Sequence, residues 1–127
     1  MGSLIRVRCK NCYEDWSLRL GYGLMHGRID PILSLFPEEI TKKLPIEKLQ
    51  KYEMPWSFAF EPAMCEHCKA LIALPVLRLS ANRNPQYASC PECGTAVTLV
   101  KEDALPHTPC PACGAETLEV TEEGLWD

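Results

Sequence analysis

The sequence predicts a small α+β protein whose fold is dominated by metal sites. Three observations predict this class. All eight cysteines fall in four Cys-x-x-Cys pairs, alternating strand-like segments flank these pairs, and a stretch with helix-start signals lies between the first pair and the second. Of its 127 residues, 46% are hydrophobic and 24% are charged, a composition that is ordinary for a globular protein. The chain is too short for a barrel enzyme, which needs roughly 250 residues.

The four pairs admit three interpretations. The pairs are Cys9/Cys12, Cys65/Cys68, Cys90/Cys93 and Cys110/Cys113. Disulfides need an oxidising compartment, and a bridge across Cys-x-x-Cys closes a loop too small to stabilise much. Thioredoxin-like redox chemistry needs one such pair within a βαβ pattern, which is not seen. Four pairs are typical of tetrahedral metal binding by two four-cysteine sites, and we favour this interpretation.

The spacing within each pair has a physical reason. Two thiolates three residues apart can bind one ion if the backbone turns tightly around it, and two such turns complete a tetrahedron. Gly94 and Gly114 directly follow the third and fourth pairs, and glycine tolerates the positive φ of such a turn. Pro91 and Pro111 lie between the cysteines of the same pairs. Tyr13 and Lys69 stand where the other two pairs would have glycine.

The two Cys-Pro-x-Cys-Gly segments resemble the knuckles of zinc ribbons and rubredoxins. The resemblance implies that one ion is shared by Cys90, Cys93, Cys110 and Cys113. By elimination, the other site then consists of Cys9, Cys12, Cys65 and Cys68. An alternative pairing joins Cys65/Cys68 to Cys90/Cys93 and leaves the two outer pairs to meet. No physical rule decides between the pairings, and we favour the sequential one.

The sequential pairing divides the chain into two zinc ribbons. The first covers residues 1–83 and contains a helical insertion at about residues 30–52; the second covers residues 84–127. Residues 82–86 are polar and rich in turn formers, so we place the boundary there. The wider layout also resembles a group of small bacterial zinc-ribbon proteins, through residues 20–25 and the four knuckles. That resemblance implies no established activity.

Zinc and iron both accept four thiolates in tetrahedral geometry. We expect two Zn²⁺ ions. Iron is the less favoured choice and would make the chain a rubredoxin-like electron carrier.

Alternating residues predict strands at both ends of the chain and in its middle. The expected strands are residues 4–8, 16–20, 56–60, 71–74, 76–79, 95–100 and 117–121. Asp30-Pro31 and Pro37-Glu38-Glu39 are helix starts, and Pro45 stops or kinks the second helix. Trp16, Trp56 and Phe58 are expected to pack between the ribbon and the helices.

Charge is distributed unevenly. The formal net charge is −4. Residues 1–83 carry 12 Lys/Arg and 9 Asp/Glu, whereas residues 84–127 carry one Lys and 8 acids. Nucleic-acid binding works through basic faces, so the acidic C-terminal part is a poor candidate. The N-terminal part keeps this function open as an alternative.

Three histidines and one glycine motif are further candidate functional groups. His67 and His107 lie in or near knuckles and could replace a cysteine, but four thiolates per site make this unnecessary. His26 is a candidate general base; a loop histidine is more often hydrogen-bonded or at the surface. Gly21-x-Gly23 lacks the full phosphate-binding fingerprint and is better explained by a turn.

These observations together predict a non-enzymatic protein with two structural zinc sites that acts as an interaction or adaptor module. The expected partner is another protein, contacted through the helical insertion and residues 21–27. No apolar segment is long enough to cross a bilayer, and no signal peptide is apparent, so we expect a cytoplasmic protein.

Overall fold

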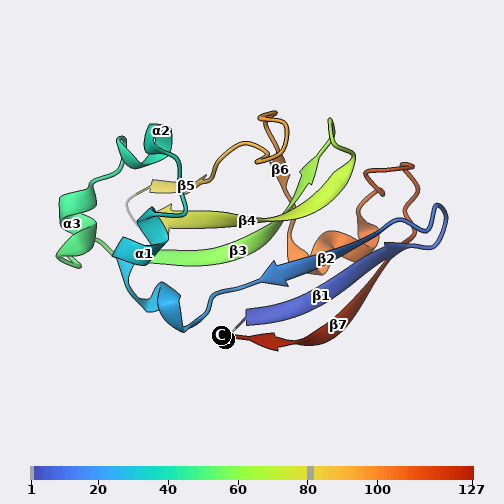
Figure 1. Cartoon of the computed structure of the whole chain (residues 1–127), viewed down its shortest axis with the longest axis horizontal. Coiled ribbons are helices and arrows are strands. Elements are labelled where there is room, and N and C mark those ends of the chain that lie inside the picture. Colours follow the sequence, from blue (N-terminus) through green and yellow to red (C-terminus); the bar gives the residue numbers. More distant parts are fainter. Residues whose placement is uncertain (1, 80–81) are drawn as a thin grey trace.

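The computed structural model describes residues 2–79 and 82–127. Its strands form two antiparallel sheets, one of three strands in the order β2-β1-β7 and one of four in the order β5-β4-β3-β6 (Figure 1). The strands are β1 (Gly2–Cys9), β2 (Asp15–Leu20), β3 (Trp56–Cys65), β4 (Ala70–Leu79), β5 (Asn82–Gln86), β6 (Thr98–Leu99) and β7 (Leu118–Trp126). A bridge between Gly21 and Phe60, with N···O distances of 2.9 and 2.7 Å, joins the sheets.

Short helices fill the connections. They are the 3-10 helix η1 (Leu24–Gly27), the α-helices α1 (Ile29–Leu33), α2 (Glu38–Thr41) and α3 (Ile46–Gln50), and the 3-10 helix η2 (Glu102–His107). The helical insertion is therefore confirmed in outline, as three α-helices of one turn or slightly more. Pro37 caps α2 and Pro45 caps α3, as their lack of a helical N–H predicts. α1 begins one residue before Asp30, with Arg28 as its N-cap.

The predicted strands flanking the first two cysteine pairs are present, in longer form. β3 and β4 form one hairpin of ten residues a side, from Trp56↔Leu79 to Cys65↔Ala70. The expected strand at 95–100 is reduced to the two residues of β6, and the sequence did not predict η2. Both lie between the third and fourth cysteine pairs, where little chain is left for regular pairing.

The predicted division into two sequential ribbons is not the architecture of this molecule. The last strand, β7, pairs with the first strand, β1, from Gly2↔Trp126 to Cys9↔Leu118. The proposed boundary at residues 82–86 is the edge strand β5, which pairs with β4; an edge strand tolerates the proline that made this segment look like a turn. Ser80 and Ala81 lie outside the described residues.

In the described part of the chain, the core consists of three apolar clusters. One lies under the three-stranded sheet around Ile5, Val7 and Leu118 and includes Cys9 and Cys110. A second packs α1 and α3 onto the open end of the β3–β4 hairpin through Ile32, Leu49 and Phe58. The third surrounds Cys65 and Cys90. The helices thus cap the end of the hairpin that lies farthest from the cysteines (Figure 1). No helix among the described residues is long and apolar enough to cross a membrane.

Candidate metal centres

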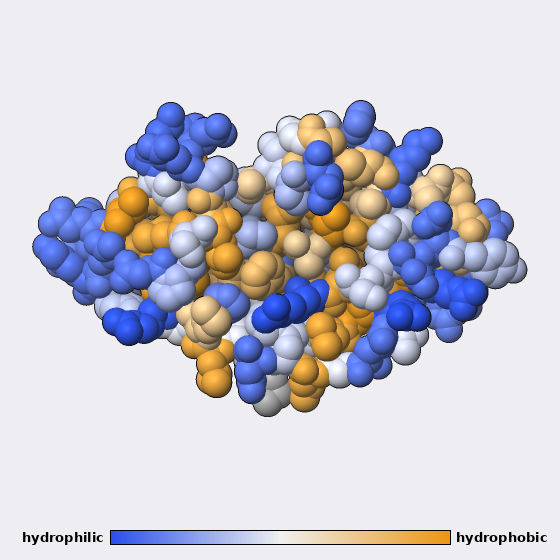
Figure 2. Space-filling model, in the orientation of Figure 1, coloured by the Kyte–Doolittle hydropathy of each residue, from blue (hydrophilic) through white to orange (hydrophobic). Residues whose placement is uncertain are grey.

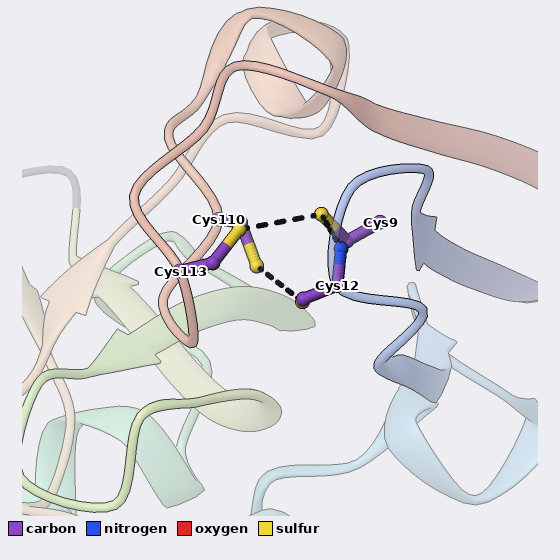
Figure 3. Close-up of side chains that lie close together, drawn as sticks. All are labelled: Cys9, Cys12, Cys110 and Cys113. Carbon is purple, nitrogen blue, oxygen red and sulfur yellow. Dashed lines mark hydrogen bonds between the residues drawn. The ribbon is translucent and has the colours of Figure 1, made fainter.

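The eight cysteines form two groups of four. We call Cys9, Cys12, Cys110 and Cys113 the outer site and Cys65, Cys68, Cys90 and Cys93 the inner site; in each group all four Sγ atoms lie within 4.8 Å of one another. In Figure 3 the outer site's first pair lies on the loop between β1 and β2, and its side chains face the second pair on the loop before β7. Each of the eight predicted ligands therefore belongs to one of the two groups.

The sequential grouping of the cysteines is corrected by this arrangement. The structure adopts the alternative grouping, in which the first and last pairs meet and the two middle pairs meet. Strand register is the physical reason. Cys9 ends β1 and pairs with Leu118 at the start of β7, which brings the preceding Cys110/Cys113 turn alongside. Cys65 ends β3, where Met64 pairs with Thr98 of β6, and the Cys90/Cys93 turn comes just before β6.

The sulfur positions match a tetrahedral tetrathiolate. Four sulfurs, each about 2.3 Å from a central ion, form a tetrahedron with edges of about 3.8 Å. In the outer site the Sγ atoms of Cys9 and Cys113 lie 3.6 Å apart and those of Cys12 and Cys110 lie 3.7 Å apart. In the inner site the corresponding distances are 3.5 Å for Cys65–Cys93 and 3.9 Å for Cys68–Cys90. The donor set and its spacing therefore fit one metal ion in each site.

All four cysteine turns share one backbone conformation. The residue after each second cysteine has positive φ: 65° at Tyr13, 54° at Lys69, 75° at Gly94 and 81° at Gly114. The amide of this residue donates to the carbonyl of the first cysteine in the turns at Cys9, Cys90 and Cys110, with N···O distances of 2.7 to 3.0 Å. The turns without glycine thus share positive φ with those that have glycine. Their cost is steric, because Tyr13 and Lys69 carry a Cβ in the left-handed backbone conformation.

Backbone and side-chain donors surround the sulfurs. The amides of Cys12 and Cys68 lie 3.5 and 3.4 Å from the Sγ atoms of Cys9 and Cys65. The Thr117 hydroxyl lies 3.2 Å from Cys9 Sγ, and the Asn11 amide group donates to Cys113 Sγ at 3.5 Å. Such donors stabilise thiolates and orient them for the ion. Thr117 and Asn11 were missed by the sequence analysis, because only their position beside a ligand distinguishes them.

The local environment splits the thiol pKa values within each site. The Thr117 hydroxyl, followed by backbone amides, lowers the pKa of Cys9 to about 6. Thr95 likewise lowers the pKa of Cys93 to about 6. The neighbouring Cys93 and desolvation raise the pKa of Cys68 to about 12. Four clustered thiols do not all lose their protons without a nearby cation, because the thiolates would repel one another. A divalent metal ion supplies the positive charge that offsets this repulsion.

Burial follows the order of cysteines in each motif. The first cysteine of every pair is buried, with exposed fractions of 0 to 3%, whereas Cys68 and Cys113 are exposed and Cys12 and Cys93 are half-buried. One edge of each site therefore faces solvent, which gives an ion a route of entry. Four thiolates already complete a tetrahedral shell, so a bound ion would keep no position for water or substrate.

The histidines lie outside both groups. His67 and His107 are exposed and belong to neither four-cysteine set. His26 accepts a hydrogen bond at Nδ1 from the Gly23 amide at 2.8 Å, and its ring lies 4.8 Å from that of Phe58 and 5.9 Å from that of Trp126. Burial, with a smaller contribution from the Arg19 cation, lowers its pKa. His26 is thus a neutral acceptor that fixes its own loop.

The Gly21-x-Gly23 segment is also explained by packing. Gly21 has φ 89° and bridges to β3. A Cβ on Gly23 would lie 2.2 Å from the carbonyl carbon of Asp127, so only glycine fits there. The Gly23 amide is used by His26 and is not available to a phosphate.

Comparison with known proteins adds no relatives: no protein-family model, no curated protein and no solved structure matches this chain.

Proposed function

We propose that this chain is a zinc-binding protein in which two closed four-cysteine sites hold structural ions and stabilise a non-enzymatic module that binds another protein. The gathering of all eight sulfurs into two groups of four, each with its Sγ atoms within 4.8 Å of one another, carries the first part of the proposal. Elemental analysis of protein purified without a histidine tag tests it, with two zinc ions per chain expected. A ratio below one, or iron in place of zinc with the red colour of a ferric tetrathiolate, would contradict it.

An exposed apolar loop supports the interaction role. Tyr22, Leu24 and Met25 expose 54, 82 and 71% of their surface. The loop is held by two hydrogen bonds between Gly23 and His26, at 2.8 and 3.0 Å. Apolar side chains on a rigid loop lose little entropy on binding, and clustered exposed apolar residues mark interaction surfaces.

The loop is a better contact surface than the helical insertion. Hydrophilic residues gather over α2 and α3 on the face shown in Figure 2. Those helices are too short to present a continuous apolar stripe. We therefore assign the contact to the segment Tyr22–Met25 alone.

The nucleic-acid alternative receives less support. Basic residues of β1 and of the turn after it lie beside acidic residues of β7: Arg6 Nε lies 2.9 Å from Glu123 Oε1, and Lys10 Nζ lies 3.8 Å from Glu119 Oε2. Nucleic-acid binding would have to compete with these pairs. A mobility shift with DNA or RNA at low salt would revive it.

A matched pair of variants tests the interaction role. A photo-crosslinking residue at position 24 should capture a defined partner from the source cell, and the same residue at the less exposed Leu35 (41%) should not. In the chain that carries this residue at position 24, the substitutions Tyr22→Ser/Met25→Ser, which remove the other exposed apolar side chains of the loop, should retain both metal ions and lose the crosslinked partner. Equal capture at both positions would refute the assigned surface.

A further inference from the structure

The two metal sites are nested in the chain and share one structural element. The inner pair Cys68/Cys90 spans 22 positions, whereas the outer pair Cys12/Cys110 spans 98. We call residues 62–64 and 71–73, which flank Cys65 and Cys68 on the β3–β4 hairpin, the hairpin tip; its residues pack in the apolar clusters of both sites. We propose, on the basis of the proposed function, that the inner site takes its metal first and that its occupancy raises the affinity of the outer site.

The two faces of the hairpin tip belong to different sites. Met64 and Leu71 are cross-strand partners, and both pack in the apolar cluster that contains Cys9 and Cys110. The adjacent pair, Ala63 and Ile72, packs in the cluster that contains Cys65 and Cys90. An inner ion that ties Cys65 to Cys90 and Cys93 would therefore also fix the wall against which the outer site packs.

The segment between the third and fourth cysteine pairs makes a second connection. Val97 is 8% exposed and packs in the inner cluster, whereas Leu105 is fully buried in the outer one. Between them, Thr98 of β6 pairs with Met64, and the Val100 amide donates to the Pro62 carbonyl at 2.9 Å. Once the inner site has closed, residues 94–109 therefore extend from the hairpin tip to the outer site, with Cys110 at their end.

Chain entropy sets the order of loading. The cost of closing a flexible loop grows as (3/2)RT ln n. For spans of 22 and 98 positions, this factor alone favours the inner site by about tenfold. Closing the inner site first shortens the free chain that the outer site must still close, so the second ion binds to a partly ordered molecule. Coupling of this kind is reciprocal between the two sites.

The loading order is tested with the metal-free, reduced full-length chain. One equivalent of Zn²⁺ is added, free thiols are alkylated, and peptides are identified by mass spectrometry. Protection of Cys65, Cys68, Cys90 and Cys93 with alkylation of the other four is expected. Equal alkylation of both sets, or protection of the outer set, would overturn the proposed order.

The coupling is tested with Co²⁺, whose tetrathiolate complex absorbs visible light. In the variant Cys90→Ser/Cys93→Ser, the outer site should bind Co²⁺ at least tenfold more weakly than in the wild type. Met64→Ala/Leu71→Ala, which keeps every ligand, should also weaken the outer site. Leu77→Ala, which removes a fully buried side chain of β4 in the helix cluster, should not. Unchanged outer affinity in the first variant would refute coupling, whereas a wild type that binds no metal would refute the proposed function itself.

Discussion

Four residues carry the left-handed backbone that closes the cysteine turns. Gly94 and Gly114 have this conformation at little cost, whereas Tyr13 and Lys69 have it with φ of 65° and 54°. A side-chain-bearing residue in this region costs about 1–2 kcal/mol relative to the right-handed region. Nothing lies within 4 Å of a Cβ placed on either glycine, so backbone conformation alone separates the two kinds of turn.

Exchanging these residues should change stability in opposite directions. Lys69→Gly should raise the free energy of unfolding by up to about 1 kcal/mol. The gain is no larger because glycine also makes the unfolded chain more flexible, which favours unfolding. Gly94→Ala and Gly114→Ala should each lower it by about 1 kcal/mol. Denaturant unfolding of the metal-loaded protein measures the differences. The Lys69 result would be contradicted by a loss of stability with metal content unchanged.

His26 should make stability depend on pH. Folding favours its neutral form, because Nδ1 accepts the Gly23 amide and burial, then Arg19, lowers the pKa below the usual 6.5. The folded chain therefore binds fewer protons than the unfolded chain as pH falls through about 6.5. The contribution of His26 is complete above that pH and decreases below it.

The measurement compares thermal unfolding of wild type and His26→Gln at pH 8 and pH 6, with zinc content checked at both. The wild type should lose more stability than the variant between these values. Parallel losses in both proteins would show that His26 is not the titrating group.

At the scale of the elements, the β1–β7 pairing holds the two ends of the chain together. Trp126 crosses over Gly2, where a Cβ would lie 2.3 Å from its ring. Its indole N–H donates to the Leu20 carbonyl at 2.9 Å, and the Arg19 guanidinium lies 3.9 Å from its ring centroid. One side chain therefore fastens β7 to the end of β2 across β1.

Trp126→Ala should therefore destabilise the protein by about 2–3 kcal/mol, through lost packing, a lost hydrogen bond and a lost cation–π contact. Trp126→Phe keeps an aromatic ring and should cost roughly 1 kcal/mol. Hydrogen exchange should show the loss first in β7 and in the end of β2. Exchange that increased only in β3 and β4 would contradict this role.

The sequence predicted most elements but not their partners. Alternation predicts β1 and β2 because each has one buried and one exposed face, whereas β3 and β4 are packed on both faces near the cysteines. Pro37 and the two acids after it predict the start of α2, but Pro45, which is expected to stop or kink a helix, lies at the N-cap of α3. Whether β7 pairs with β6 or with β1 depends on contacts between residues more than 100 positions apart, which no local pattern encodes. The identity of the eight ligands could therefore be predicted, whereas the grouping of those ligands could not.

At the scale of the whole molecule, two bound metal ions would contribute as much free energy as the net stability of a typical domain. A structural zinc site contributes on the order of 10 kcal/mol, and domains of this size are stable by only about 5–15 kcal/mol in total. Both cysteine clusters contain buried ligands as part of their apolar packing. The helices α1, α2 and α3 have only four or five residues each, so they are too short to be stable without the sheet.

A strong chelator in the presence of a reductant should consequently unfold the whole chain. Far-UV circular dichroism and tryptophan fluorescence should change together, and both should recover when Zn²⁺ is restored. Native-like signals from α1 to α3 in the chelated protein would show that the helix cluster folds independently.

The grouping of the cysteines makes a prediction that separates this fold from two sequential ribbons. With Zn²⁺ in excess, Cys113→Ser should make Cys9 and Cys12 reactive to alkylation and leave the inner set protected, because Cys113 lies 3.6 Å from Cys9 in the outer site. Cys65→Ser should make Cys90 and Cys93 reactive, since Cys65 lies 3.5 Å from Cys93. Sequential ribbons require the reverse: the Cys113 variant would expose Cys90 and Cys93, and the Cys65 variant would expose Cys9 and Cys12. Excess metal keeps the unaltered site occupied despite coupling, so the pattern of alkylated peptides reports which thiols share an ion.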